Sequence, residues 1–140
     1  MPEPKNRLRL PANLLLAFYG IAMFAGTHWP TMAPGVQNNL DKVYHFAAYA
    51  GLTFLILLWW LAHRGLTWRG YLAVICLVGL LGAIDEVTQI PVGRSADVRD
   101  WIADMLGAHV GAAGFMYLRW VLQAPRAVAS SAGPRDPSRQ

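Results

Sequence analysis

Four long apolar stretches, separated by short polar segments, dominate the chain. They cover residues 10–29, 43–62, 71–90 and 101–122. A helix rises about 1.5 Å per residue and the hydrocarbon core of a bilayer is about 30 Å thick, so about 20 apolar residues suffice to cross it. The pattern therefore predicts an all-α polytopic membrane protein with four transmembrane helices.

The composition supports this class and excludes others. Hydrophobic residues make up 55% of the 140 and charged residues only 14%, whereas a soluble domain carries about 25% charged residues. Such a chain is too apolar for general disorder, and its single cysteine, Cys76, excludes a disulfide framework. The net charge of +4 comes from scattered basic residues that form no recognisable basic face, so we expect no nucleic-acid partner.

The length fits one domain. We expect residues 1–123 to form the transmembrane domain and residues 124–140, which are small, polar and proline-rich, to form a disordered cytoplasmic tail. The first apolar stretch follows basic residues, as in a signal peptide. However, its length of about 20 residues exceeds the roughly 7–15 of a signal core, which favours a retained helix.

The basic residues predict the orientation in the membrane. With the N-terminus inside, nine of the 12 lie on the cytoplasmic side and three outside. Because positive residues concentrate in cytoplasmic segments, we expect both termini inside and a location in the cytoplasmic (inner) membrane. The inner set is Lys5, Arg7, Arg9, Arg64, Arg69, Arg119, Arg126, Arg135 and Arg139, and the outer set is Lys42, Arg94 and Arg99.

The same orientation brings six of the eight acidic residues to the outer end. This end also carries the three outer basic residues, so its net charge is −3. Carboxylates within a membrane are costly and normally face a bundle interior or a wet cavity, which predicts an outward-facing polar cup. The acidic residues are Asp41, Asp85, Glu86, Asp97, Asp100 and Asp104.

Helical spacing groups these polar residues with glycines. Asp41, His45 and Tyr49 recur every four residues and share one helix face. On the third and fourth helices polar residues at the outer end continue into glycines deeper in the membrane, and stripes of small residues allow close helix packing. The third-helix stripe is Gly79, Gly82, Glu86 and Gln89; the fourth-helix stripe is Asp100, Asp104, Gly107, Gly111 and Gly114.

Several of these residues also have ordinary structural interpretations. Asp41 is a suitable helix cap, Lys42 a residue that extends to the headgroups, and Asp100 a partner of the helix dipole. Asp85 lies nearer the helix flank than Glu86. We expect Glu86, Arg94 and Asp104 to converge, since a carboxylate at that depth needs a charged partner and Arg94 offers a bidentate one.

Four motifs in order resemble the VanZ-like family. They are D-K-x-x-H-F-x-x-Y from Asp41, D-E-x-x-Q from Asp85, P-x-G-R from Pro91 and R-D-x-x-x-D-x-x-G from Arg99, within residues 41–111. Where many members carry Asn before the final glycine, this chain carries Asp104. The family is named after a protein that confers teicoplanin resistance, and the resemblance implies a role in the cell envelope.

Three functions remain open. The cup could bind or handle an envelope amphiphile, such as a membrane lipid, a lipid-linked precursor or a lipoglycopeptide. It could also belong to a metal-assisted or acid/base membrane hydrolase, or only hold the helices together. No cofactor is established, but a divalent cation would suit Asp41, His45, Glu86 and Asp104. The candidate cup residues are Asp41, Lys42, His45, Tyr49, Glu86, Gln89, Arg94, Asp100 and Asp104.

Overall fold

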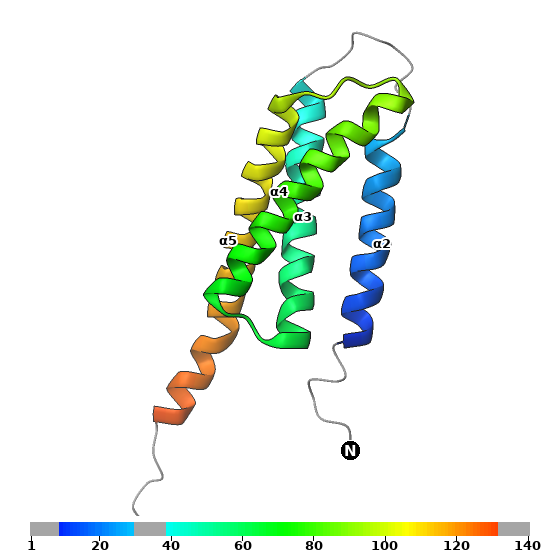
Figure 1. Cartoon of the computed structure of the whole chain (residues 1–140). Helices are drawn as coiled ribbons and strands as arrows, with labels where there is room; N and C mark the ends of the chain where they lie inside the picture. The colour runs from blue at the N-terminus through cyan, green and yellow to red at the C-terminus, as the bar shows by residue number, and fades with distance from the viewer. Residues whose placement is uncertain (1–8, 30–38, 132–140) are drawn as a thin grey trace, which may run out of the picture.

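The described part of the protein is entirely helical apart from short connections, which confirms the expected all-α class. The computed structural model describes residues 9–29 and 39–131. The elements are α2 (Arg9–Thr27), α3 (Asn39–Arg64), α4 (Trp68–Gln89), the short 3₁₀ helix η1 (Ile90–Val92) and α5 (Val98–Ser131) (Figure 1).

Local sequence explains where α4 and α5 begin. Gly65 follows α3 with φ +73°, a left-handed conformation that suits glycine. Thr67 then caps α4 by accepting a hydrogen bond from the backbone N–H of Gly70 at 3.2 Å. Gly93, with φ +83°, ends η1. Asp97 caps α5, because its carboxylate accepts a hydrogen bond from the backbone N–H of Arg99 at 2.8 Å.

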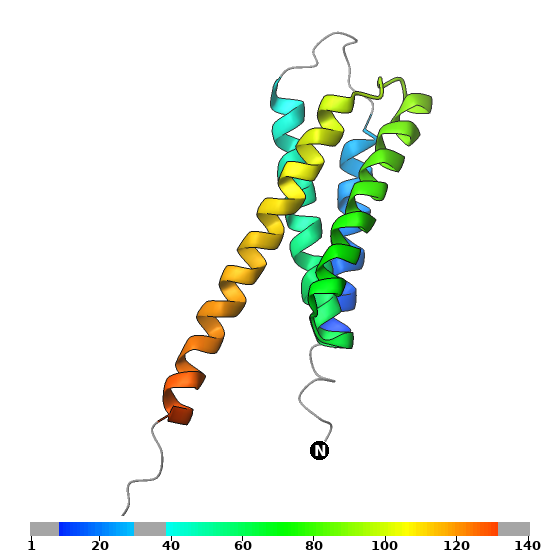
Figure 2. The ribbon, with the colours of Figure 1, turned by 60° about the vertical axis from the view of Figure 1, so that its left-hand side comes forward.

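The helices run alternately up and down. Both α3 and α4 contact the three other long helices, and the most extensive contacts are those of α3 with α5 and α2. The start of α2 and the end of α5 therefore point to the same end of the bundle (Figure 1). Towards its C-terminal end α5 diverges from the other helices (Figure 2). The opposite end gathers the end of α2, the start of α3, the end of α4 and the start of α5.

Glycines bring α5 close to α3 and α4. A Cβ atom at Gly107 would overlap the backbone carbonyl of Phe46, and one at Gly111 would overlap that of Ala50. On α4, Gly79 faces Met105 and Gly82 faces Asp104, both on α5. Only Gly114 departs from the expected stripe: it is exposed and nothing lies within 4 Å of its Cβ position.

An aromatic residue closes the contact between α2 and α3. The Tyr19 ring covers Gly51, and its hydroxyl donates a hydrogen bond to the carbonyl oxygen of Ala48 at 2.9 Å. Nearer the other end, the indole N–H of Trp59 donates to the side chain of Asn13 at 2.7 Å. The first helix is thus attached to the bundle by hydrogen bonds at specific points and by the partly buried side chains of Leu16, Tyr19 and Met23, which pack against the core.

The outer surface of the bundle is apolar, as expected for a membrane protein. Large exposed side chains include Phe18, Leu80 and Leu106. Three segments are long and apolar enough to cross a membrane: Arg9–Thr27, Leu40–Arg64 and Trp68–Val92. In α5 the uncharged part is confined to the stretch between Asp104 and Arg119, so the four-span count stays a prediction.

Two expected boundaries change. The fourth helix extends to Ser131, so residues 124–131 of the expected disordered tail are helical, while residues 132–140 lie outside the described residues. The second of the four expected helices begins earlier than its expected start near residue 43, since α3 starts at Asn39. Asp41 is therefore inside the first turn of α3 and is not its cap.

Candidate functional site

The candidate site lies where the four helix ends meet. Its deepest part joins α3, α4 and α5. A hydrogen bond of 2.9 Å connects Nδ1 of His45 to Oδ1 of Asp104, and Oε1 of Glu86 lies 3.7 Å from the same nitrogen. These residues are almost completely buried, with 2%, 0% and 5% of their surface exposed, respectively. The convergence expected for Glu86 and Asp104 is present, but His45 joins them.

The deep part contains polar atoms without partners. Oε2 of Glu86 accepts a hydrogen bond from the backbone N–H of Asp97 at 2.8 Å. Within the described residues, however, Oε1 of Glu86, Oδ2 of Asp104, Nε2 of His45 and the hydroxyl of Tyr49 have no hydrogen-bond partner. A buried polar group left unpaired costs about 1–3 kcal/mol. Such atoms are suited to hold a ligand.

Arg94 does not bind Glu86 or Asp104, contrary to the sequence-based expectation. Its guanidinium donates to both carboxylate oxygens of Asp41, each at 2.7 Å, and to the carbonyl oxygen of Thr27 at 3.2 Å. The reason is the position of Asp41 inside the first turn of α3, where its carboxylate is free of a capping role. Arg94 therefore connects the loop before α5 to the C-terminal end of α2 and to the first turn of α3.

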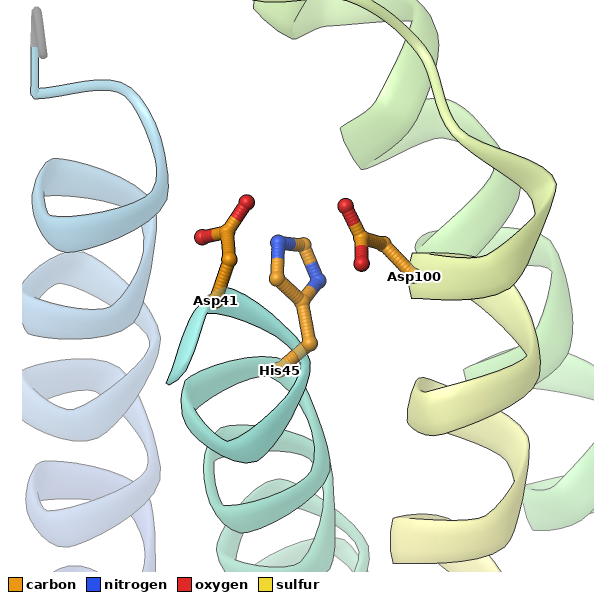
Figure 3. A group of neighbouring side chains, drawn as sticks. All are labelled: Asp41, His45 and Asp100. Atoms are coloured by element: carbon orange, nitrogen blue, oxygen red, sulfur yellow. The ribbon is translucent and has the colours of Figure 1, made fainter. Parts of the chain in front are cut away.

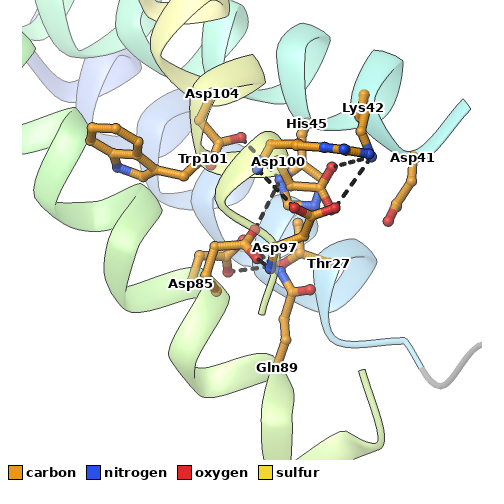
Figure 4. Close-up of polar contacts among 12 residues, drawn as sticks. Thr27, Asp41, Lys42, His45, Asp85, Gln89, Asp97, Asp100, Trp101 and Asp104 are labelled. Carbon is orange, nitrogen blue, oxygen red and sulfur yellow. Dashed lines mark hydrogen bonds and ion pairs between the residues drawn. The ribbon is translucent and has the colours of Figure 1, made fainter. Parts of the chain in front are cut away.

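Lys42 neutralises the start of α5. Its ammonium lies 3.1 Å from Oδ1 of Asp100 and 3.6 Å from Oδ2 of Asp97. It thus turns towards the acidic residues, as drawn in Figure 4, rather than only towards the headgroups. The backbone N–H of Arg99, together with the Lys42 ammonium, holds the pKa of Asp97 below its usual range, so Asp97 is ionised at neutral pH.

Asp85 belongs to a separate set of polar contacts between α2 and α4, which we call the α2–α4 junction. Its carboxylate accepts hydrogen bonds from the Thr27 hydroxyl and from the Gln89 amide, both at 3.0 Å (Figure 4). His28 adds a contact with the Thr88 hydroxyl at 3.0 Å. Asp85 is buried here rather than on an open flank, and Gln89 serves Asp85 rather than the deep set.

Sequence reasoning missed Thr27 and His28, which complete the α2–α4 junction. The signal available was a pair of polar residues, Thr27 and His28, at the end of an otherwise apolar helix. That pattern is also the ordinary way for a membrane helix to end, so it did not single out either residue.

We call the remaining charged groups the acidic cluster: Asp41, Lys42, His45, Glu86, Arg94, Asp97, Asp100 and Asp104. It has five carboxylates against one ammonium and one guanidinium. With His45 neutral its net charge is 2 − 5 = −3. Two of the three excess charges lie in the deep part, on Glu86 and Asp104. Asp41 is paired with Arg94, whereas Asp97 and Asp100 share Lys42 and leave the third.

Two groups of side chains in the acidic cluster bring metal-binding atoms together. His45, Glu86 and Asp104 each place one such atom within 4.8 Å of the others, and so do Asp41, His45 and Asp100. Figure 3 shows the imidazole of His45 between the carboxylates of Asp41 and Asp100. Three of the four expected metal-binding residues thus meet in the deep group, and Asp41 belongs to the outer one. Both groups offer imidazole nitrogen and carboxylate oxygen, which suit divalent cations.

The family resemblance of the sequence holds in a direct comparison. The family model described as VanZ/LLP1 matches residues 2–121. The match extends beyond the motif region at 41–111 and includes the whole of α2. No curated protein and no solved structure matches the chain.

Proposed function

Since the chain belongs to the VanZ/LLP1 family, we propose that it is an integral membrane protein of the cell envelope that binds the headgroup of an amphiphile at the acidic cluster. The proposal includes four membrane spans with both termini in the cytoplasm. The acidic cluster then faces the outer side of the cytoplasmic membrane, at the level of the lipid headgroups.

The observation that carries the proposal is the uncompensated negative charge of the acidic cluster. Five carboxylates face one ammonium, one guanidinium and the imidazole of His45, which is uncharged when neutral. Unpaired buried charge is strongly unfavourable, so the cluster is suited to a positively charged group from outside. The unpartnered oxygens of Glu86 and Asp104 support a position for that charge in the deep part.

The charge also selects the headgroup. A primary ammonium offers three N–H donors and one positive charge, which matches carboxylate oxygens that lack donors. A bare phosphate or pyrophosphate would be repelled. The ligand is an amphiphile rather than a soluble amine, because the helices that carry the cluster present an apolar surface directly below it. A lipidated glycopeptide with an amino group, such as teicoplanin, belongs to this class.

A resistance assay tests the proposal in cells. The chain is expressed in a glycopeptide-susceptible host, and the minimum inhibitory concentration of teicoplanin is compared between wild type and Glu86→Gln. We expect wild type to raise it several-fold and Glu86→Gln to abolish the increase at equal protein level.

Asp85→Asn is the matched control, because Asp85 is adjacent on α4 and equally buried but belongs to the α2–α4 junction. It is expected to retain the increase. If both variants accumulate normally and protect equally well, the acidic cluster is not the binding site.

A further inference from the structure

We propose that the deep part of the acidic cluster, formed by His45, Glu86 and Asp104, is a binding site for one divalent transition-metal ion such as Zn²⁺ or Mn²⁺. The inference goes beyond the proposed function. It concerns an ion held by the protein alone, and its binding is measured with no amphiphile present.

The spacing of the three side chains matches the requirements of a metal ion. Nitrogen and oxygen ligands bind Zn²⁺ at about 2.1 Å, so two ligands of one ion lie about 3.0–3.4 Å apart at bond angles between square and tetrahedral. Nδ1 of His45 lies 2.9 Å from Oδ1 of Asp104 and 3.7 Å from Oε1 of Glu86. These two distances lie just below and just above that range, and all three ligand atoms lie within 4.8 Å of one another.

The unpartnered atoms are an independent indication. Oε1 of Glu86 has no hydrogen-bond partner, although Oε2 of the same carboxylate is held by the backbone N–H of Asp97. The carboxylate is thus fixed in position with one oxygen left over. Oδ2 of Asp104 and the hydroxyl of Tyr49, both fully buried, also lack partners. A metal ion, with a water molecule in its open position, supplies contacts for such atoms.

The outer part of the acidic cluster lies next to the imidazole of His45. A histidine ligand usually donates its other ring N–H to a carboxylate, which fixes the ring. Asp41 and Asp100 place carboxylate oxygens within 4.8 Å of a ring nitrogen of His45, on either side of the ring (Figure 3). Each already has a cationic partner, and Nε2 of His45 has no hydrogen-bond partner among the described residues, so these two carboxylates lie near the ring without holding it.

The set of ligands indicates the kind of ion. Mg²⁺ and Ca²⁺ prefer sites made of oxygen ligands alone, whereas an imidazole nitrogen with two carboxylates suits Zn²⁺ or Mn²⁺. A bound divalent ion changes the charge of the acidic cluster from −3 to −1. The cluster therefore remains negative with the metal in place, and its remaining charge lies in the outer part.

The test is a direct titration. The full chain is purified in detergent without a histidine tag, stripped with EDTA and dialysed, and then titrated with Zn²⁺ by calorimetry and with Mn²⁺ by electron paramagnetic resonance. We expect saturable binding of one ion per chain. Glu86→Gln should weaken binding at least about 100-fold, since even the partners of metal ligands contribute about 10–100-fold.

Matched variants separate a lost ligand from a lost fold. Glutamine at position 86 can still accept the hydrogen bond from Asp97, and the thermal unfolding temperature of each variant is recorded without metal. Asp85→Asn, equally buried but outside both metal-binding groups, should bind the ion as wild type does.

Two results overturn the inference. The first is the absence of saturable Zn²⁺ or Mn²⁺ binding to wild type, which needs no variant to interpret. The second is binding that Asp41→Asn abolishes and Glu86→Gln leaves intact, which places the ion in the outer group. Both results are obtained without an amphiphile, so they test metal binding independently of the proposed headgroup binding.

Discussion

His45 on α3 and Asp104 on α5 are 59 positions apart in the chain, yet their side chains are joined by a 2.9 Å hydrogen bond at the centre of the candidate site. One turn further along α5, Gly107 lies directly against the backbone carbonyl of Phe46, the residue after His45. The absence of a side chain at Gly107 thus sets the helix separation at which this bond forms. The glycine contacts and the polar site therefore depend on the same close approach of α3 and α5.

Gly111→Ala should therefore destabilise the bundle. The added Cβ would overlap the carbonyl of Ala50, and backbone cannot move aside as a flexible side chain can. We expect a loss of about 1–3 kcal/mol, typical of an overpacked contact, measured by thermal unfolding in one detergent.

Gly114→Ala, on the same helix, is the control for this change. Its Cβ would meet open space, and alanine favours a helix over glycine by about 1 kcal/mol. Equal destabilisation by the two alanines would contradict the packing role of Gly111.

Arg94→Ala should weaken the outer end of the bundle more than Arg99→Ala. Arg94 neutralises Asp41 through two hydrogen bonds and also holds the end of α2, so its loss leaves a partly buried carboxylate unpaired. Breaking a buried ion pair costs about 3–5 kcal/mol, and the partial exposure of Asp41 reduces this figure. The readout is thermal unfolding in one detergent.

Arg94→Lys should recover only part of this loss, because an ammonium cannot form the two parallel hydrogen bonds of a guanidinium. The Arg99 side chain is exposed, so its removal should change stability little. Similar unfolding temperatures for Arg94→Ala and Arg99→Ala would show that the Arg94–Asp41 pair does not hold the bundle.

Both ends of the chain should lie in the cytoplasm. The reason is the nine-to-three distribution of basic residues, together with a bundle in which the start of α2 and the end of α5 point the same way. Alkaline phosphatase, which is active only outside the cytoplasm, is fused to either end. Little activity is expected from either fusion, whereas a fusion in the connection between α4 and α5 should be active. High activity at a terminus would place the acidic cluster on the cytoplasmic side of the membrane and contradict the proposed orientation.

The sequence predicted the helices and most of the site because both depend on periodicity. Apolar runs of bilayer length indicated four helices, and the four-residue spacing of Asp41 and His45 and the stripe through Glu86 placed these residues on interior faces. Gly107 and Gly111 were likewise found, since glycines spaced by four residues share one face of a helix.

The choice of partners could not be predicted in the same way. Arg94 had several carboxylates within reach, and which one it binds depends on the loop geometry after Gly93 and on the start of α3 at Asn39. Asp85 was predicted to lie on a helix flank because its burial depends on the approach of α2. No pattern in the sequence of α2 indicates that the Thr27 hydroxyl binds the Asp85 carboxylate. Gly114 continues the stripe in sequence, but it is exposed, and at its level the neighbouring Phe115 makes the contact with α3 by packing against Phe54.

The central claim is that the acidic cluster binds a positively charged headgroup. The most direct measurement compares the binding of dodecylammonium and of N-acetyldodecylamine, its uncharged counterpart, to the chain in phosphatidylcholine nanodiscs, with empty nanodiscs subtracted. We expect the ammonium form to bind wild type at least about tenfold more tightly, equivalent to about 1.4 kcal/mol, with the preference lost in Glu86→Gln and kept in Asp85→Asn. Equal affinity of wild type for the two amphiphiles would contradict the account.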